Sequence, residues 1–294
     1  MRMFSRGTPL VVFVFAVVGA GCSLFVLDEG EFSGGGRAPA TERDADVAPS
    51  EAGASDPDGA SPDTGVDAAT SRYASAILAD EPTLYSRLGE SKGTTAKATA
   101  GADGTYSVAG LALGAPGAIA GDPDTAVTLT DGSGRITIDT GASFDGLVPF
   151  SVELWVKPSP SNTTLGFVFD HTYWSGSERR GWNFLAGNEQ TNFERWVSAT
   201  DRSIAYGAPV SVGQWHHLVG TFDGATLRVY VDGLRVSEST TSVVLPARTS
   251  VLTIGHQSCD CGRSNSFIGD IDELAVYDRA LTDTQIAAHY AAAK

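Results

Sequence analysis

The chain has 294 residues, with 20 lysine and arginine side chains against 35 aspartate and glutamate side chains. Its formal net charge of -15 argues against a nucleic-acid partner, because phosphate backbones attract basic surfaces. This length is compatible with one large all-β domain of about 200–250 residues or with two smaller domains.

The first 22 residues have the layout of a secretory signal peptide. Two arginines make the start positive, residues 10–18 are an unbroken apolar run, and small residues follow. The apolar run is too short for a membrane-spanning helix, which needs about 20 residues. Cys22 comes next, so the segment resembles a bacterial lipobox, although Gly19 stands where leucine is usual. We therefore expect an exported lipoprotein, anchored at the outer membrane or the cell surface through Cys22; the alternative is an ordinary signal peptide that is cut nearby.

Residues 23–72 are predicted to be a disordered, acidic linker. They consist largely of Gly, Ala, Ser, Pro, Asp and Glu, with few large apolar residues. Such a segment buries too little apolar surface to offset the entropy lost on ordering. We expect it to hold the following domain away from a membrane.

Residues 73–294 have the pattern of an antiparallel β-domain, in which short apolar runs alternate with turn signals. Residues 150–157 alternate between an apolar and a more polar face. Residues 214–236 contain three strand-like runs separated by two Asp-Gly pairs, which predicts a three-stranded meander. Further strands are expected at residues 126–130, 135–139, 166–170, 182–186, 195–198, 251–255 and 267–277. A short C-terminal helix should begin at Thr282, which forms a capping box with Gln285.

Six segments together resemble a known family. They are LYSRLGE (84–90), GDPDTAVTL (121–129), FSVELWVKP (150–158), QWHHLVGTFDG (214–224), LRVYVDG (227–233) and FIGDIDELAVYDRALTDTQIAAHY (267–290). In this order they resemble the laminin-G-like, pentraxin-like domains of the concanavalin A-like lectin/glucanase superfamily. The resemblance implies a two-sheet antiparallel jelly-roll sandwich that binds carbohydrate or protein, often with a structural calcium.

Catalysis is not expected. The glucanases of this superfamily carry paired carboxylates in an E-x-D-x-(x)-E pattern on one strand, which is absent here. Asp270, Asp272 and Glu273 come closest, but strand alternation places Glu273 on the opposite face from the two aspartates. His216 and His217 are adjacent on one strand and therefore point to opposite faces. We expect a module that binds without cleaving.

Aromatic side chains are the main candidates for ligand contact, because sugars stack on aromatic rings. Alternation directs Trp155 to the outer face of its strand, and directs Arg228 and Tyr230 to the outer face of the meander. Trp174 lies in residues 171–182, which are rich in aromatic, arginine and glycine residues, as a binding loop can be. The alternative is that the tryptophans fill the core.

A calcium site is expected mainly from the family resemblance. Asp122, Asp124 and Asp272 are its candidate ligands, completed by backbone carbonyls. A plain Asx turn is the alternative for the two aspartates of the GDPD segment. A disulfide between Cys259 and Cys261 is also predicted, because export leads to an oxidising compartment and lipidation would occupy the third cysteine. Two free thiols are the alternative, since this ring is very small.

The sequence therefore predicts a cell-surface or periplasmic lipoprotein that binds an extracellular glycan or polymer. A protein-interaction or adhesion domain without a sugar site is the alternative, and a glycoside hydrolase ranks third. The sequence gives no indication of the oligomeric state.

Overall fold

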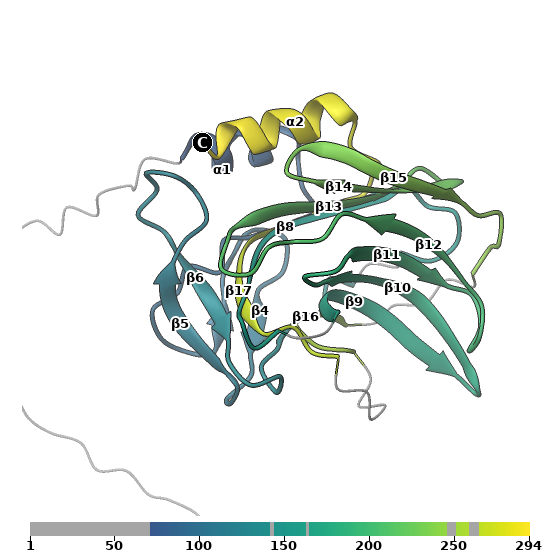
Figure 1. The fold of residues 1–294 in the computed structure, drawn as a ribbon, viewed down its shortest axis with the longest axis horizontal. Coiled ribbons are helices and arrows are strands. Elements are labelled where there is room, and N and C mark those ends of the chain that lie inside the picture. Colours follow the sequence, from purple (N-terminus) through teal and green to yellow (C-terminus); the bar gives the residue numbers. More distant parts are fainter. Residues whose placement is uncertain (1–70, 142–143, 163–164, 246–250, 259–264) are drawn as a thin grey trace, which may run out of the picture. The chain divides into compact units, whose positions relative to one another are not determined.

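The computed structural model describes residues 71–294, except for residues 142–143, 163–164, 246–250 and 259–264 (Figure 1). The predicted signal peptide, lipidated Cys22 and most of the acidic linker lie outside the described residues, as do Cys259 and Cys261. These features stay predictions. Neither helix of the described residues has the length and apolarity needed to cross a membrane.

Two antiparallel sheets form a sandwich, which confirms the predicted fold class (Figure 1). Within the described residues, sheet A has nine strands: β15-β14-β13-β8-β17-β1-β3 are neighbours in this order, β6 pairs with β17, and β5 pairs with β6. Sheet B has eight, in the order β12-β11-β10-β9-β16-β7-β4-β2. The strands of sheet A are β1 (Leu84–Ser86), β3 (Ala98–Ala100), β5 (Leu111–Pro116), β6 (Thr125–Leu129), β8 (Phe150–Pro158), β13 (His216–Phe222), β14 (Thr226–Val231), β15 (Leu234–Thr240) and β17 (Gly269–Tyr277). Those of sheet B are β2 (Thr95–Ala96), β4 (Gly104–Tyr106), β7 (Ile136–Ile138), β9 (Gly166–Ser175), β10 (Glu178–Ala186), β11 (Thr191–Trp196), β12 (Arg202–Gly207) and β16 (Leu252–Ile254).

The main core lies between the sheets. Phe150 of β8 packs against Trp182 and Phe193 of sheet B, with ring centroids 4.7 and 6.0 Å apart. Gly220 of β13 allows a close approach of the sheets, because a Cβ atom there would lie 2.7 Å from the Phe193 ring. Burying one face of each sheet in this way is what drives a sandwich to form.

The predicted meander is present as β13, β14 and β15. Asp232 and Gly233 both have positive φ, of 53° and 79°, as a two-residue type I′ hairpin turn requires. The segment expected as a binding loop at residues 171–182 is instead part of a regular hairpin. It continues β9 and β10 to a turn at Gly176, which has φ of 65°.

Two helices cover the side of sheet A that faces away from sheet B (Figure 1). The helix α1 (Arg72–Ala79) was not predicted, whereas α2 (Asp283–Ala292) begins at the predicted capping box. A second buried cluster joins the helices to the sheet. It contains Tyr73, Ala74, Ile77, Tyr85, Ile119, Trp155, Val219, Tyr230, Ala275, Tyr277, Leu281, Ile286 and Ala293.

His289 links α2 to sheet A and to the C-terminal end of α1. Its Nδ1 lies 3.0 Å from Glu153 Oε2 and its Nε2 lies 2.9 Å from Asp80 Oδ2. Both nitrogens face carboxylate oxygens, so the ring can donate to both only as the imidazolium. Burial favours the neutral ring, but the hydrogen bonds and charges of Glu153 and Asp80 together raise the pKa of His289.

Candidate functional site

The four predicted ligand-binding residues do not form one site. Trp155 and Tyr230 were expected to be exposed, which is wrong: their exposed fractions are 0% and 1%. The helices cover them, because Trp155 stacks on Tyr290 of α2 at 5.9 Å and the Tyr230 hydroxyl donates to Asp283 at 2.7 Å. They therefore stabilise the docking of α2.

The other two predicted residues lie on different sheets. Arg228 is on β14 of sheet A, where its Nη1 lies 2.6 Å from Asp223 Oδ2 and its Nε lies 3.3 Å from Glu238 Oε2. Trp174 is on β9 of sheet B, and 41% of it is exposed. Of the four, only Trp174 combines an exposed side chain with a large aromatic ring, and it lies on sheet B.

The outward side of sheet B carries a set of aromatic, arginine and carboxylate side chains. Their neighbours Phe169, Phe184, Phe193 and Ala205 point into the core, so alternation places them on the opposite side. Across the strands, Asp170 pairs with Asn183 and Asn183 with Glu194, while Trp174 pairs with Arg179. We call this surface the sheet B face and define it by Asp170, Trp174, Arg179, Asn183, Glu194, Trp196 and Tyr206.

The centre of the sheet B face is a fixed polar and aromatic network. The guanidinium carbon of Arg179 lies 4.1 Å from the centroid of the Trp196 ring, and that of Arg202 lies 4.5 Å from it. Trp196 Nε1 donates to Glu194 Oε2 at 3.0 Å. In the amide orientation that satisfies both partners, the Asn183 nitrogen donates to Glu194 Oε2 at 3.2 Å and the Asn183 oxygen accepts from Arg179 Nη2 at 2.9 Å. Asn183 therefore links Glu194 to Arg179. Bonded in this way, the side chains cannot rearrange freely.

Two carboxyl groups of this face are buried. Burial raises the pKa of Asp170 to about 6, against the opposing effects of Ser258, Arg179 and Thr172. Burial also raises the pKa of Glu194, although Arg202 and Asn192 oppose it. Asp170 accepts hydrogen bonds from the Ser258 amide at 2.6 Å and from the Thr172 hydroxyl at 2.9 Å. Both carboxyls are thus occupied by neighbouring groups.

The exposed part of the sheet B face lies at two of its corners. Trp174 is on β9 near the hairpin turn, and Tyr206, which is 55% exposed, is on β12. Tyr206 of β12 pairs with Asn192 of β11, and Asn192 pairs with Leu185 near the end of β10. Trp174 of β9 pairs with Arg179 near the start of β10. The two rings therefore lie at opposite ends of a diagonal across four strands.

Two of the three carboxylates expected to bind calcium, Asp122 and Asp124, contact an arginine together with Glu273. Arg87 Nη2 lies 2.6 Å from Asp122 Oδ2 and 2.7 Å from Glu273 Oε1, and its Nε lies 2.9 Å from Asp124 Oδ2. Among the described residues, no group of three or more His, Cys, Asp or Glu side chains is arranged to hold a metal ion. Arg87 therefore pairs with two of the three carboxylates that were predicted to bind calcium, and the calcium site stays a prediction.

Asp272 nevertheless has a buried oxygen without a partner. Its Oδ2 accepts from the Ala118 amide at 2.8 Å, while Oδ1 makes no hydrogen bond. A Cβ atom on Gly117 would lie 3.1 Å from Asp272 Oδ2 and 2.6 Å from the carbonyl oxygen of Asp124, so these two oxygens converge there. Burial and the nearby Glu273 raise the pKa of Asp272. Asp272 thus has an unpaired Oδ1, and its Oδ2 lies near the Asp124 carbonyl oxygen. Carboxylate and carbonyl oxygens are the ligand types that a hard cation such as calcium takes.

The strand alternation assumed for Glu273 is wrong. A β-bulge between Asp272 and Ala275 adds one residue to β17 relative to β8, and Glu273 has φ of 54°. Glu273 accepts hydrogen bonds from Tyr85 and Arg87. Because Tyr85 belongs to the cluster under the helices, Glu273 lies on the same outer side of sheet A as Asp272.

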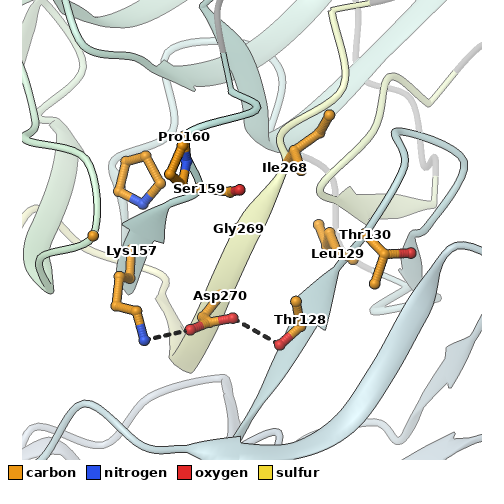
Figure 2. Close-up of a pocket in the computed structure, with 11 residues that line it drawn as sticks. Thr128, Leu129, Thr130, Lys157, Ser159, Pro160, Ile268, Gly269 and Asp270 are labelled. Carbon is orange, nitrogen blue, oxygen red and sulfur yellow. Dashed lines mark hydrogen bonds and ion pairs between the residues drawn. The ribbon is translucent and has the colours of Figure 1, made fainter.

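A pocket of about 360 Å³ opens where β6, β8 and β17 lie side by side in sheet A (Figure 2). Asp270 is flanked by Thr128 and Lys157, its cross-strand partners. The Thr128 hydroxyl donates to Asp270 Oδ1 at 2.7 Å, and Lys157 Nζ lies 2.6 Å from Oδ2. The pocket is lined by Thr128, Leu129, Thr130, Lys157, Pro158, Ser159, Pro160, Gly213, Ile268, Gly269 and Asp270.

His216 belongs to a serine–histidine–aspartate arrangement at the ends of two strands. Its Nε2 lies 2.8 Å from Ser211 Oγ, and its Nδ1 lies 2.8 Å from Asp232 Oδ2. The Ser211 amide also donates to Nε2 at 3.0 Å, so this nitrogen already accepts a backbone hydrogen bond. The set joins the turn before β13 to the turn after β14, which is a structural role.

Comparison with known proteins decides the family. The Laminin_G_3 model, described as the concanavalin A-like lectin/glucanases superfamily, matches residues 130–287. The chain belongs to this superfamily. No curated protein matches the sequence of this laminin-G-like chain.

Solved structures share the fold of the laminin-G-like domain at low sequence identity. Domain 4 of AbnA, a GH43 extracellular arabinanase from Geobacillus stearothermophilus in complex with arabinotriose, is 23% identical with a TM-score of 0.51, and the match covers 72% of this chain and 98% of that one. The binding domain of botulinum neurotoxin serotype D is 13% identical with a TM-score of 0.53, covering 74% and 52%. That of serotype G is 13% identical with a TM-score of 0.53, covering 71% and 50%, so the chain spans about half of the neurotoxin domains.

Sequence reasoning missed most of the residues that the laminin-G-like domain brings together. Asp170, Arg179 and Glu194 lie on three strands and meet only through the register of sheet B. Asp270 and Lys157 are 113 positions apart and meet through the pairing of β17 with β8. The available signal is local: polar or charged residues alternate with apolar ones along each strand, which predicts that they share the face away from the core.

Proposed function

We propose that this laminin-G-like domain binds an extracellular glycan without cleaving it, and that the sheet B face is the binding surface. The observation that carries the proposal is the pair of exposed rings, Trp174 and Tyr206, at two corners of this face. Sugars bind by stacking apolar C–H surfaces on such rings.

The spacing of the rings favours an oligosaccharide over a single sugar. Three strand spacings and about six residues along a strand separate Trp174 from Tyr206, which corresponds to a distance on the order of 25 Å. A polymer of several sugar units spans such a distance. The arabinotriose in the AbnA domain is shorter than this distance, so it is a suitable first probe of one ring at a time, and longer oligosaccharides probe both.

The absence of cleavage is supported by the state of the two carboxyls. Glycoside hydrolysis requires an acid and a second carboxylate that both reach the glycosidic bond. Asp170 and Glu194 are buried and bonded to neighbouring side chains, so neither is presented to a ligand. We expect no new reducing ends when the purified chain is incubated with a bound polysaccharide.

The test combines a panel of immobilised polysaccharides with titration of arabinotriose into the purified full chain. Trp174→Ala and Tyr206→Ala should each weaken glycan binding about tenfold, which is about 1.4 kcal/mol. Arg228→Ala is the matched control on sheet A and should bind as the wild type does. If both aromatic variants bind every glycan as tightly as the wild type, the sheet B face is not the site and a protein-binding role becomes the better explanation.

Export and anchoring complete the proposal. Their support is the positive start, the apolar run and the small residues that precede Cys22. Stable anchoring requires more than one acyl chain, which lipidation of a bacterial N-terminal cysteine would provide. Cys22→Ala should lose membrane fractionation in a Gram-negative host. A soluble wild-type protein whose mature chain begins at another residue would contradict the anchor.

A structural calcium is proposed as well. Its support is the unpaired Asp272 Oδ1 and the Asp124 carbonyl oxygen that converges with the Asp272 carboxylate on Gly117. A cation there would neutralise the buried charge of Asp272, because the ion pairs of Arg87 are formed with Asp122, Asp124 and Glu273. Its role would be to stabilise the junction of β17 with the segment before β6.

A further inference from the structure

The pocket on sheet A contains a polar row that is only partly used. Asp270 lies between Thr128 and Lys157, and each of its oxygens makes one of the two contacts described above (Figure 2). An ionised carboxylate offers about four lone-pair positions and an ammonium offers three donors. Asp270 can therefore accept further hydrogen bonds, and Lys157 can donate further ones. Their side chains are 12% and 30% exposed, so a ligand can reach both.

The charges of this row cancel. Lys157 Nζ is 2.6 Å from Asp270 and 5.3 Å from the centroid of the Trp215 ring. An anionic ligand would be repelled by the Asp270 carboxylate, and a cationic ligand would be repelled by the Lys157 ammonium. A neutral ligand with adjacent hydroxyls avoids both penalties, because one hydroxyl can accept from Lys157 while the other donates to Asp270.

The remaining wall of the pocket is largely aliphatic. Ile268 lies on one side and Pro160 on the other (Figure 2). Pro158 and Leu129, whose side chain is buried in the core, complete this part of the lining. The volume of about 360 Å³ is near the lower end of the range of about 300–1,000 Å³ that is usual for small-molecule sites, which suits one ring better than a chain. The ligand should therefore have one hydroxylated edge and one C–H surface.

We propose that this pocket binds a single neutral pyranose unit through Asp270 and Lys157, at a site separate from the sheet B face. The pocket belongs to sheet A and shares no residue with the sheet B face. The choice of a saccharide as the ligand class rests on the proposed function, whereas the location of the site does not. With both sites, one domain would contact two sugar units at once.

The indole N–H of Trp215 is the reporter, because its ring lies against Lys157. The full chain has 5 tryptophans, so its nitrogen-15 spectrum should show few indole signals, and Trp215→Phe identifies the relevant one. The probes are the neutral methyl glycosides of glucose, galactose and mannose, with glucuronic acid and glucosamine as charged counterparts. At least one neutral glycoside should shift the Trp215 signal saturably, and the charged sugars should bind more weakly.

Variants connect the shift to the pocket. Asp270→Asn and Lys157→Met should each weaken binding of the neutral glycoside about tenfold, since each removes a charge-assisted hydrogen bond. Lys97→Met is the matched control, because Lys97 forms an exposed pair with Asp103 at the same 2.6 Å distance, and it should have no effect. Thr128→Val is a milder change that should weaken binding if Asp270→Asn fails to fold.

Three results would overturn the pocket assignment: no neutral glycoside shifts the Trp215 signal, the Asp270 and Lys157 variants bind normally, or a charged sugar binds more tightly than its neutral counterpart. Trp174→Ala separates this inference from the proposed function. It should leave the Trp215 shift intact while it weakens oligosaccharide binding. Loss of the Trp215 shift in Trp174→Ala would show that the two sites are one, which would also overturn the inference.

Discussion

Trp155 and Trp174 provide a paired test of which tryptophan stabilises the fold. Trp155→Ala removes a ring with no exposed surface that contacts Tyr290, His217 and Tyr73 at centroid distances of 5.9, 5.1 and 6.1 Å. Truncation of a buried tryptophan costs about 3–5 kcal/mol. Trp155 Nε1 is buried without a hydrogen-bond partner, so its removal also relieves a desolvation penalty. The expected loss is therefore about 3 kcal/mol, at the lower end of that range.

Thermal unfolding of the full chain measures this effect. For a domain of this size, a loss of about 3 kcal/mol corresponds to a fall in Tm of about 6–12 °C. Trp174→Ala changes a ring that is 41% exposed and should move the Tm by less than about 2 °C. A Trp155→Ala variant that melts with the wild type, or a Trp174→Ala variant that loses as much stability, would refute the assignment of Trp155 to the helix interface.

Three further predictions concern the stability of the domain. Burial favours neutral His289, but its two carboxylate partners raise its pKa above 6.5, so its stabilising effect is complete below that value and is lost as pH rises through the folded-state pKa. The Tm of the wild type should fall over that window more steeply than the Tm of His289→Gln, and equal slopes would refute this. Calcium should raise the Tm of the wild type and a chelator should lower it, whereas the Tm of Asp272→Asn should respond to neither. A wild-type Tm that does not change with calcium would contradict the site. The unreduced chain should be lighter by one hydrogen molecule if Cys259 and Cys261 are bridged, and a full mass would contradict the disulfide.

The strands were predictable because their signals are local. Alternation in β8 and the two Asp-Gly turns around β14 depend only on neighbouring residues, and all three are present in the structure. The covering of sheet A was not predictable in this way. Strand alternation predicts that Trp155 and Tyr230 share the face away from the core, but it does not predict what packs on that face. The large ring of Trp155 on the otherwise polar face of β8 was the available hint, because apolar residues on both faces are typical of a strand that is buried on both.

The candidate site was harder to predict than the fold because it depends on register and on an irregularity. The bulge between Asp272 and Ala275 places Glu273 on the other side of the sheet from the one predicted, and no residue type in the segment indicates the bulge. The sheet B face requires four strands in register, which no single segment determines. Trp174 was proposed from sequence because residues 171–182 have an unusual local composition, and its role in binding stays a prediction.

The position of α1 has a mechanical consequence. The described chain begins at Ser71 and enters α1 on the outer side of sheet A, whereas Trp174 and Tyr206 face outward from sheet B. A load applied between the N-terminus and a ligand on the sheet B face would therefore act across the thickness of the sandwich. Such a load would reach α1 before any strand, because α1 is the first described element and its Tyr73 and Ile77 pack against sheet A. In a domain that is tethered through its N-terminus and holds a ligand on sheet B, the contacts of α1 with sheet A would therefore carry the load first.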